Sequence, residues 1–258
     1  MTHSSPWGHL AQGAPLGQVR MARGQALSGY RIGVIHIEDV WYPLVPGNVV
    51  NAHTFDFPVR LKPVRGLSVA GLFGADSVDV GAAVLEACAE LVDEGVWAIS
   101  AACGFFGRYQ VIAQRESPVP VALSSLVQLP WLRAICPPGK IAVLTADSAS
   151  LDADMLAACG VADTHDLLVG GLQAAPQFSA ILQGRGEFDN EAVRAEVVAQ
   201  AVELCADPDV TAVLLECSDM PPYAAAVQAA TGKPVFDFTT LIRFLASSVS
   251  HRPYAGFI

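Results

Sequence analysis

The sequence predicts an α/β protein of two pseudo-symmetric lobes, each a parallel-type sheet flanked by helices, with the active site in the crevice between the lobes. Short β-branched runs alternate with segments of helical periodicity along the chain. The halves also match: a strand-like run opens each, at Ile32 and Ile141, and a cysteine follows a later strand of each, at Cys103 and Cys217. Two such lobes bind a ligand between the carboxyl ends of their sheets.

The first half contains three clear elements. Residues 31–37, RIGVIHI, form a β-branched run suited to a buried parallel strand. Apolar residues then recur at helical spacing from Ser77 to Gly95, with Ser77 or Asp79 as the N-cap and Gly95 as the stop. Residues 96–100, VWAIS, follow as a strand that ends just before a cysteine.

The second half repeats this alternation, with glycine and proline at several element ends. The expected elements are, in order, a strand over 140–145, a helix from Leu151 to Gly160, a helix over about 190–207, a strand over 210–216, a helix from Pro221 to Gly232, a strand over 234–238 and a helix over 239–249.

A Pro-Pro-Gly stretch at 137–139 is expected to separate the two lobes. The expected organisation is a flexible N-terminal arm over 1–29, a first lobe over 30–137, a second lobe over 138–236, and a C-terminal helix and tail over 237–258 that pack back on the first lobe.

Composition and charge exclude several function classes. The 258 residues are 52% hydrophobic and 16% charged, with a net charge of −10 and no cluster of Lys and Arg, so no nucleic-acid partner is expected. No apolar stretch approaches the ~18–20 residues needed to span a bilayer, so no membrane partner is expected either. The N-terminal residues lack the apolar centre of a secretory signal, which favours a cytoplasmic location. A homodimer or higher homo-oligomer is expected.

No cofactor or metal is expected. GLFGADS at 71–77 and PPGK at 137–140 lack the spacing of phosphate-binding loops. The sequence also contains no C-x-x-C, no H-E-x-x-H and no cluster of Cys and His with metal-ligand spacing.

The six cysteines divide into two kinds. Cys88, Cys159 and Cys205 lie on apolar helical faces, where packing explains them, and the fourth, at 136, lies in a connection. The remaining two each follow a strand and precede a turn, in SAACG and ECSDMPP. Free backbone N–H groups of such turns favour a thiolate and an anionic substrate group.

Two thiols that face each other across a crevice suit inversion at carbon. One group removes a proton from one face of the carbon while the other delivers a proton to the opposite face, and a thiolate and a thiol can exchange these roles. The carbon acid is weak, since it lies next to a carboxylate or an amide carbonyl, so the site must also stabilise an enolate-like intermediate. Cys103 and Cys217 are therefore the candidate catalytic residues.

The chain resembles the aspartate/glutamate racemase superfamily of cofactor-independent enzymes, which includes hydantoin racemases, maleate isomerases and arylmalonate decarboxylases. The resemblance runs from about Tyr30 to the C-terminus and rests on IGVIHIED, ISAACGFF and VLLECSDMPPY. Residues 42–66 are similar to the opening of a largely uncharacterised branch. The resemblance implies Cys103 and Cys217 as the acid/base pair. It also implies substrate-binding residues at Gly104, Phe105, Ser218, Asp219, Glu38 and Thr145.

The cysteine motifs depart from those of the amino-acid racemases. Cys-Gly-Phe and Cys-Ser-Asp stand where that group commonly has Cys-Asn-Thr and Cys-Thr-His. The sequence therefore indicates a racemase or epimerase acting on an amino acid or a hydantoin-like carbonyl compound. Two alternatives stay open: cis–trans isomerisation or decarboxylation of a small dicarboxylate, and non-catalytic binding of small carboxylates. For His36, at the end of the first strand, substrate binding and packing inside the sheet fit equally well.

Overall fold

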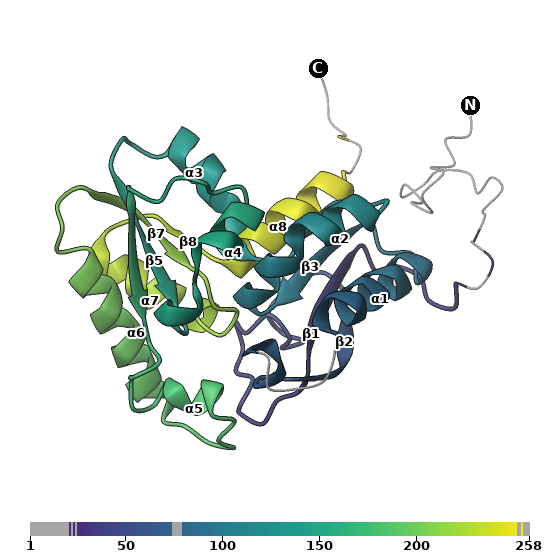
Figure 1. The fold of residues 1–258 in the computed structure, drawn as a ribbon, viewed down its shortest axis with the longest axis horizontal. Helices are drawn as coiled ribbons and strands as arrows, with labels where there is room; N and C mark the ends of the chain where they lie inside the picture. The colour runs from purple at the N-terminus through teal and green to yellow at the C-terminus, as the bar shows by residue number, and fades with distance from the viewer. Residues whose placement is uncertain (1–20, 22, 24, 74–78, 252–253, 255–258) are drawn as a thin grey trace.

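The structure, a computed structural model, describes residues 21, 23, 25–73, 79–251 and 254 of the chain (Figure 1). Most of the expected N-terminal arm, residues 1–29, lies outside the described residues. No helix among the residues that the structure describes is long and apolar enough to cross a membrane.

Two four-stranded parallel sheets form the centres of the two lobes (Figure 1). The first has the strand order β2-β1-β3-β4 and the second the order β6-β5-β7-β8. The predicted α/β fold of two similar lobes is therefore confirmed. The strands are β1 Ile32–Asp39, β2 Val59–Ser68, β3 Ala98–Ala102, β4 Val121–Ala122, β5 Lys140–Thr145, β6 Leu167–Gly171, β7 Val210–Leu215 and β8 Val235–Phe236.

Helices cover the faces of both sheets, as parallel strands with crossover connections require. The α-helices are α1 Val80–Asp93, α2 Gln110–Glu116, α3 Leu129–Ile135, α4 Ala153–Ala158, α5 Ser179–Leu182, α6 Asn190–Leu204, α7 Ala224–Thr231 and α8 Phe238–Val249. Short 3₁₀ helices are η1 Gly71–Phe73, η2 Gly104–Tyr109, η3 Ser125–Gln128, η4 Ser148–Ser150 and η5 Pro221–Tyr223.

The ends of α1 follow the local chemistry of the sequence. Of the two candidate N-caps, Asp79 has this role, because its side chain accepts a hydrogen bond from the backbone N–H of Ala82 at 3.1 Å. Gly95 adopts φ +87° just after the helix, a conformation that other residues rarely take. The strand that follows is β3, which lies two residues later in the chain than the expected span of 96–100.

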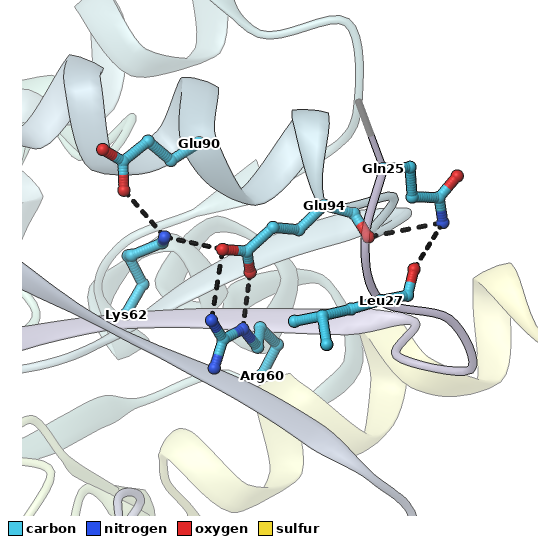
Figure 2. Close-up of polar contacts among 6 residues, drawn as sticks. All are labelled: Gln25, Leu27, Arg60, Lys62, Glu90 and Glu94. Atoms are coloured by element: carbon cyan, nitrogen blue, oxygen red, sulfur yellow. Dashed lines mark hydrogen bonds and ion pairs between the residues drawn. The ribbon is translucent and has the colours of Figure 1, made fainter. Parts of the chain in front are cut away.

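β2 is an edge strand that the sequence did not predict. On β2, Arg60 forms an ion pair with Glu94 at the C-cap of α1, and Lys62 forms ion pairs with both Glu90 on α1 and Glu94 (Figure 2). The side chain of Gln25 donates to the backbone carbonyl of Glu94, so the segment before β1 is attached to the same cluster (Figure 2). Residues 59–62, VRLK, alternate apolar and charged side chains, but Pro63 interrupts the run, and a proline inside a run argues against a strand.

The hydrophobic cores show that the lobes exchange helices. Leu129 and Leu132 of α3 belong to the core of the second lobe, although α3 precedes the expected boundary at 137. Conversely, Phe238 and Ile242 of α8 pack against Ile32 and other residues of the first sheet, although α8 follows the second lobe. Each lobe is therefore completed by a helix from the other half of the chain.

Candidate active site

The two strand-end cysteines line one cavity. Cys103 directly follows β3, and Cys217 follows β7 by two residues, so each lies at the carboxyl end of an inner strand of its own sheet. The cavity volume is ≈ 30 Å³, small against the ~300–1,000 Å³ of sites for drug-sized ligands. Six of the eight predicted site residues line this cavity: Cys103, Gly104, Phe105, Cys217, Ser218 and Asp219.

Cys103 lies at the start of η2, where backbone donors face its sulfur. Burial raises the pKa of its thiol strongly, and the negative charges of Glu216 and Asp219 raise it further. The backbone N–H groups of Phe105 and Phe106 hydrogen-bond to the side chain and lower the pKa. The fold therefore supplies the donors expected from a turn after a strand, within an otherwise acidic and buried setting.

Cys217 is more deeply buried and faces a carboxyl group directly. Its Sγ lies 3.5 Å from Oδ2 of Asp219, to which the thiol donates. Burial raises the pKa of this thiol well above its ordinary value, and the charges of Asp219 and Glu216 add to the rise, against one backbone N–H from Asp219. Cys217 thus receives less support as a thiolate than Cys103 does.

Asp219 is the centre of a polar network that spans the two lobes. Asn48 Nδ2 donates to its Oδ1, and the Tyr42 hydroxyl donates to its Oδ2 at 3.4 Å. Burial raises the pKa of Asp219 to about 6, against the lowering effect of hydrogen bonds from Cys217, Tyr42, Asn48 and Ser218. This carboxyl group therefore titrates close to neutral pH, inside the cavity.

Glu216 is a functional candidate that the sequence analysis missed. It immediately follows β7, its side chain is completely buried, and it lines the cavity. Thr145 Oγ1 donates to its Oε2 at 2.8 Å, whereas Oε1 has no hydrogen-bond partner among the described residues. Burial raises the pKa of Glu216 to about 7. An acidic residue that ends the apolar run VLLEC was a usable signal for this residue.

Thr145 and Glu38, the other two expected binding residues, do not line the cavity. Thr145 instead donates a hydrogen bond to Glu216, which does line the cavity. Glu38 is exposed, and its Oε2 accepts a hydrogen bond from the backbone N–H of Gly66 at 2.6 Å. Because successive side chains of a strand point to opposite faces, Ile37 is the residue of this strand end that lines the cavity. The expectation for Glu38 is corrected accordingly.

His36 lies on β1 with its Nδ1 2.8 Å from the carbonyl oxygen of Ile37, and it is absent from the residues found at the cavity. Tyr42 and Asn48 were not singled out from the sequence at all. They follow β1 in an irregular segment, and their role depends on contacts with Asp219, more than 170 positions further along the chain. No local pattern marks such residues.

Comparison with known proteins places the chain in a family. No established family profile matches it. It is 35% identical over 233 residues to a dimethylsulfoniopropionate lyase of Durusdinium sp. clade D, with 87% of this chain and 77% of that protein covered. The chain belongs to the dimethylsulfoniopropionate lyase family. It is also 32% identical over 236 residues to dimethylsulfoniopropionate lyase 3 of Emiliania huxleyi, of which it covers 61%.

Solved structures show the wider fold of this member of the dimethylsulfoniopropionate lyase family. Glutamate racemase of Bacillus anthracis matches with a TM-score of 0.56 at 15% identity, over 85% of this chain and 81% of that one. Allantoin racemase of Pseudomonas fluorescens matches with a TM-score of 0.55 at 18% identity, over 88% and 99%. Unliganded arylmalonate decarboxylase matches with a TM-score of 0.52 at 18% identity, over 85% and 92%. The predicted fold of the aspartate/glutamate racemase superfamily is confirmed.

The charges of the residues that line the cavity limit the kinds of ligand that this family member can bind. The described residues that line it include two carboxyl groups, Glu216 and Asp219, and no Lys, Arg or His. Tyr42 and Phe105 add aromatic rings. Among the described residues, no group of three or more His, Cys, Asp or Glu side chains is arranged to hold a metal ion. Such a cavity suits a small ligand with a cationic group, and any anionic group must be held by neutral donors.

Proposed function

We propose that the protein is a lyase that eliminates dimethyl sulfide from dimethylsulfoniopropionate. The observation that carries this proposal is the 35% identity to a dimethylsulfoniopropionate lyase over 77% of that protein's length. The cavity supports it independently, because the described residues that line it supply two thiols, two carboxyl groups and two aromatic rings, and no basic side chain.

The substrate's own chemistry defines what the site must do. Dimethylsulfoniopropionate carries a positively charged dimethylsulfonium group on its β carbon and a carboxylate on its α carbon. Removal of an α proton lets the C–H electron pair form a Cα–Cβ double bond, while the Cβ–S pair leaves with sulfur. The products are neutral dimethyl sulfide, acrylate and one proton. The protein must therefore supply a base, a place for the cation and donors for the carboxylate.

We place the sulfonium group against Asp219 and Tyr42. The carboxylate of Asp219 offers a negative charge in a buried site, where electrostatic attraction is stronger than in water. The ring of Tyr42 offers a face for a cation, as aromatic side chains do for quaternary ammonium groups. Burial and then the negative charges of Asp219 and Glu216 hold the pKa of both thiols high. A cation bound here offsets those charges, so substrate binding favours the thiolate that the reaction needs.

We assign the base to Cys103. Two backbone N–H groups face its sulfur, whereas Cys217 has one and donates its thiol proton toward Asp219. The Cys103 thiolate takes the α proton and becomes a thiol, and this proton is later released to solvent. Cys217 lies on the cavity wall near the cation site and positions the sulfonium through its contact with Asp219.

A second candidate function is racemisation or epimerisation next to a carbonyl group. The presence of both thiols in one cavity favours it, because inversion needs a base on each face of the carbon whereas elimination needs one. The two functions differ in their response to loss of one thiol. A racemase loses inversion when either cysteine is removed, whereas the lyase is abolished only by loss of its base.

The test is a set of serine variants assayed for dimethyl sulfide release and for acrylate. We expect Cys103→Ser to lower kcat by about 10²–10⁴-fold, the range for loss of a general base, and Cys217→Ser to lower kcat/KM less. Cys205→Ser, on the C-cap of α6 and away from the cavity, is the matched control and should stay within about twofold of the wild type. Full elimination activity in Cys103→Ser would refute the assigned base.

The same proteins should be incubated with amino acids and 5-substituted hydantoins in deuterium oxide. Absence of dimethyl sulfide release by the wild type, together with deuterium incorporation at a carbon next to a carbonyl, would overturn the lyase proposal in favour of the racemase.

A further inference from the structure

One oxygen of Glu216 is a buried polar atom without a hydrogen-bond partner. Thr145 satisfies Oε2, but Oε1 has no partner among the described residues, and the residue has no exposed surface. A buried polar group left unsatisfied costs ~1–3 kcal/mol, so native structures rarely keep one without a reason. Because Glu216 lines the same cavity as both thiols, a ligand is the natural partner for this atom.

The neighbouring chain leaves room for the Glu216 carboxyl group. A Cβ atom added to Gly104 would lie 1.6 Å from Oε1 of Glu216 and 2.2 Å from its carboxyl carbon. The turn after Cys103 therefore requires glycine because the carboxyl group from the other lobe occupies that space. The contact brings the carboxyl group of β7's end against the turn that carries the proposed base.

We propose that Glu216 is held as a neutral carboxylic acid whose free Oε1 side donates a hydrogen bond to the substrate's carboxylate. This inference rests on the proposed lyase function. Thr145 donates to Oε2, which leaves the acid proton for Oε1, the oxygen without a partner among the described residues. As the α proton leaves, negative charge moves onto the substrate's carboxylate oxygens, and a fixed donor there gains strength in the transition state.

Burial favours the neutral form of Glu216, and none of its described neighbours supplies a positive charge that would oppose this. Its neighbours with ionisable side chains are Cys103 from the first lobe, Cys159 at the end of α4, and Cys217 and Asp219 from the same loop. Each is neutral or negative, and no basic side chain lines the described part of the cavity. Burial raises the pKa of this carboxyl group to about 7, so below that pH it carries the proton that the hydrogen bond needs.

The proposal divides the cavity into two subsites. The carboxylate of the substrate lies at Glu216, and the sulfonium lies at Asp219 and Tyr42, so a zwitterion bridges the two. Two simple probes separate them: propionate carries only the carboxylate, and trimethylsulfonium carries only the cation. Calorimetric titration of each probe requires no turnover, so the result does not depend on the lyase reaction.

The experiment compares Glu216→Gln, which keeps a neutral N–H donor, with Glu216→Leu, which removes it, each checked for a native thermal unfolding curve. At pH 6.5 we expect Glu216→Leu to lower the affinity for propionate at least tenfold and to leave the affinity for trimethylsulfonium within about threefold of the wild type. Glu216→Gln should keep both affinities. Asp219→Asn is the matched control and should show the opposite pattern, with trimethylsulfonium weakened and propionate bound at least as well.

The pH dependence of propionate affinity separates a direct role of Glu216 from a structural one, because a purely structural residue would not change it. Wild-type propionate affinity should fall about tenfold between pH 6.5 and 8.5 as Glu216 ionises, and Glu216→Gln should lose that fall. Propionate binding by Glu216→Leu equal to that of the wild type would overturn the inference. If the wild type bound both probes in this pattern without releasing dimethyl sulfide, the lyase proposal alone would fail.

Discussion

At the scale of single residues, the cavity brings buried ionisable groups together, and their burial lowers the stability of the folded state. Asp219 and Glu216 are both buried carboxyl groups, neither has a cationic partner in the part of the chain that the structure describes, and burial raises the pKa of each. A carboxyl pKa that folding raises means that the folded protein holds the proton more tightly than the unfolded chain does. At a pH where the group is ionised in the unfolded chain, the buried site therefore reduces stability. Binding sites often carry such a cost for the sake of function.

Replacement of Asp219 by Asn should stabilise the protein at alkaline pH. The pKa of Asp219 is 3.8 as a free group and about 6 in the fold. At pH 8 this difference lowers the free energy of unfolding by about 1–3 kcal/mol, and a neutral amide avoids that loss. As pH falls toward 3, below the free value of 3.8, both states hold the proton and the difference should nearly vanish. Urea unfolding at pH 8 and at about pH 3 measures it, with the exposed Asp93→Asn as the control. An Asp219→Asn protein less stable than the wild type at pH 8 would contradict this account.

At the scale of elements, β2 and α1 are joined by the ion cluster of Figure 2. Glu94 forms ion pairs with both Arg60 and Lys62, and Nζ of Lys62 lies 2.7 Å from its Oε1. The hydrogen bond from Arg60 is the largest of the effects that lower the pKa of Glu94 to about 2. A single surface ion pair contributes little, but a network with a bidentate arginine holds an edge strand in place.

Loss of the Glu94 carboxylate should destabilise the protein in a pH-dependent way. A lowered carboxyl pKa contributes stability that is present above the ordinary value of 4.5 and is lost as pH falls toward 2. Because the cluster is partly exposed and screened by solvent, we expect Glu94→Gln to cost about 1 kcal/mol at pH 7 and nothing near pH 2. Glu86→Gln, from a more exposed pair with Arg65 on the same helix, should change little. Equal losses in the two variants, by urea unfolding, would exclude a special role for the cluster.

The elements predicted from the sequence are those whose stability is local. β5 matches its expected span of 140–145, because its apolar run is buried on both faces, and α1 matches because a cap and a glycine mark its ends. β2 and β6 were not predicted. Both are edge strands, whose residues owe their extended shape to pairing with β1 or β5 rather than to their own pattern.

At the scale of the whole molecule, the cavity exists only because two lobes meet. The cysteines could be predicted because each is marked by its own strand end and the two halves share one plan. Asn48 and Tyr42 could not, since their contacts with Asp219 join distant parts of the chain. The position of Glu38 was mistaken for a related reason: one step along a strand turns a side chain to the other face.

The exchanged helices predict that the two lobes unfold as one unit. Phe238 of α8 is completely buried in the first lobe's core, and α8 also meets α3, whose Trp131 stacks on Phe244 with ring centroids 5.8 Å apart. Phe238→Ala should cost about 3–5 kcal/mol through the cavity that it leaves. Because α3 completes the second core, this loss should lower hydrogen-exchange protection in β5 and β7 as much as in β1 and β3.

Hydrogen exchange followed by mass spectrometry of peptides measures each lobe separately. In the slowest amides of both sheets, protection should fall on the order of hundredfold or more in Phe238→Ala, the factor that such a loss of stability implies. Ser248→Ala is the control on the same helix, since this exposed side chain only donates to the backbone carbonyl of Phe244 and its loss should change protection less than about tenfold. Loss of protection confined to β1 and β3 would mean that the lobes fold independently, and the cavity between them would then depend on docking rather than on a shared core.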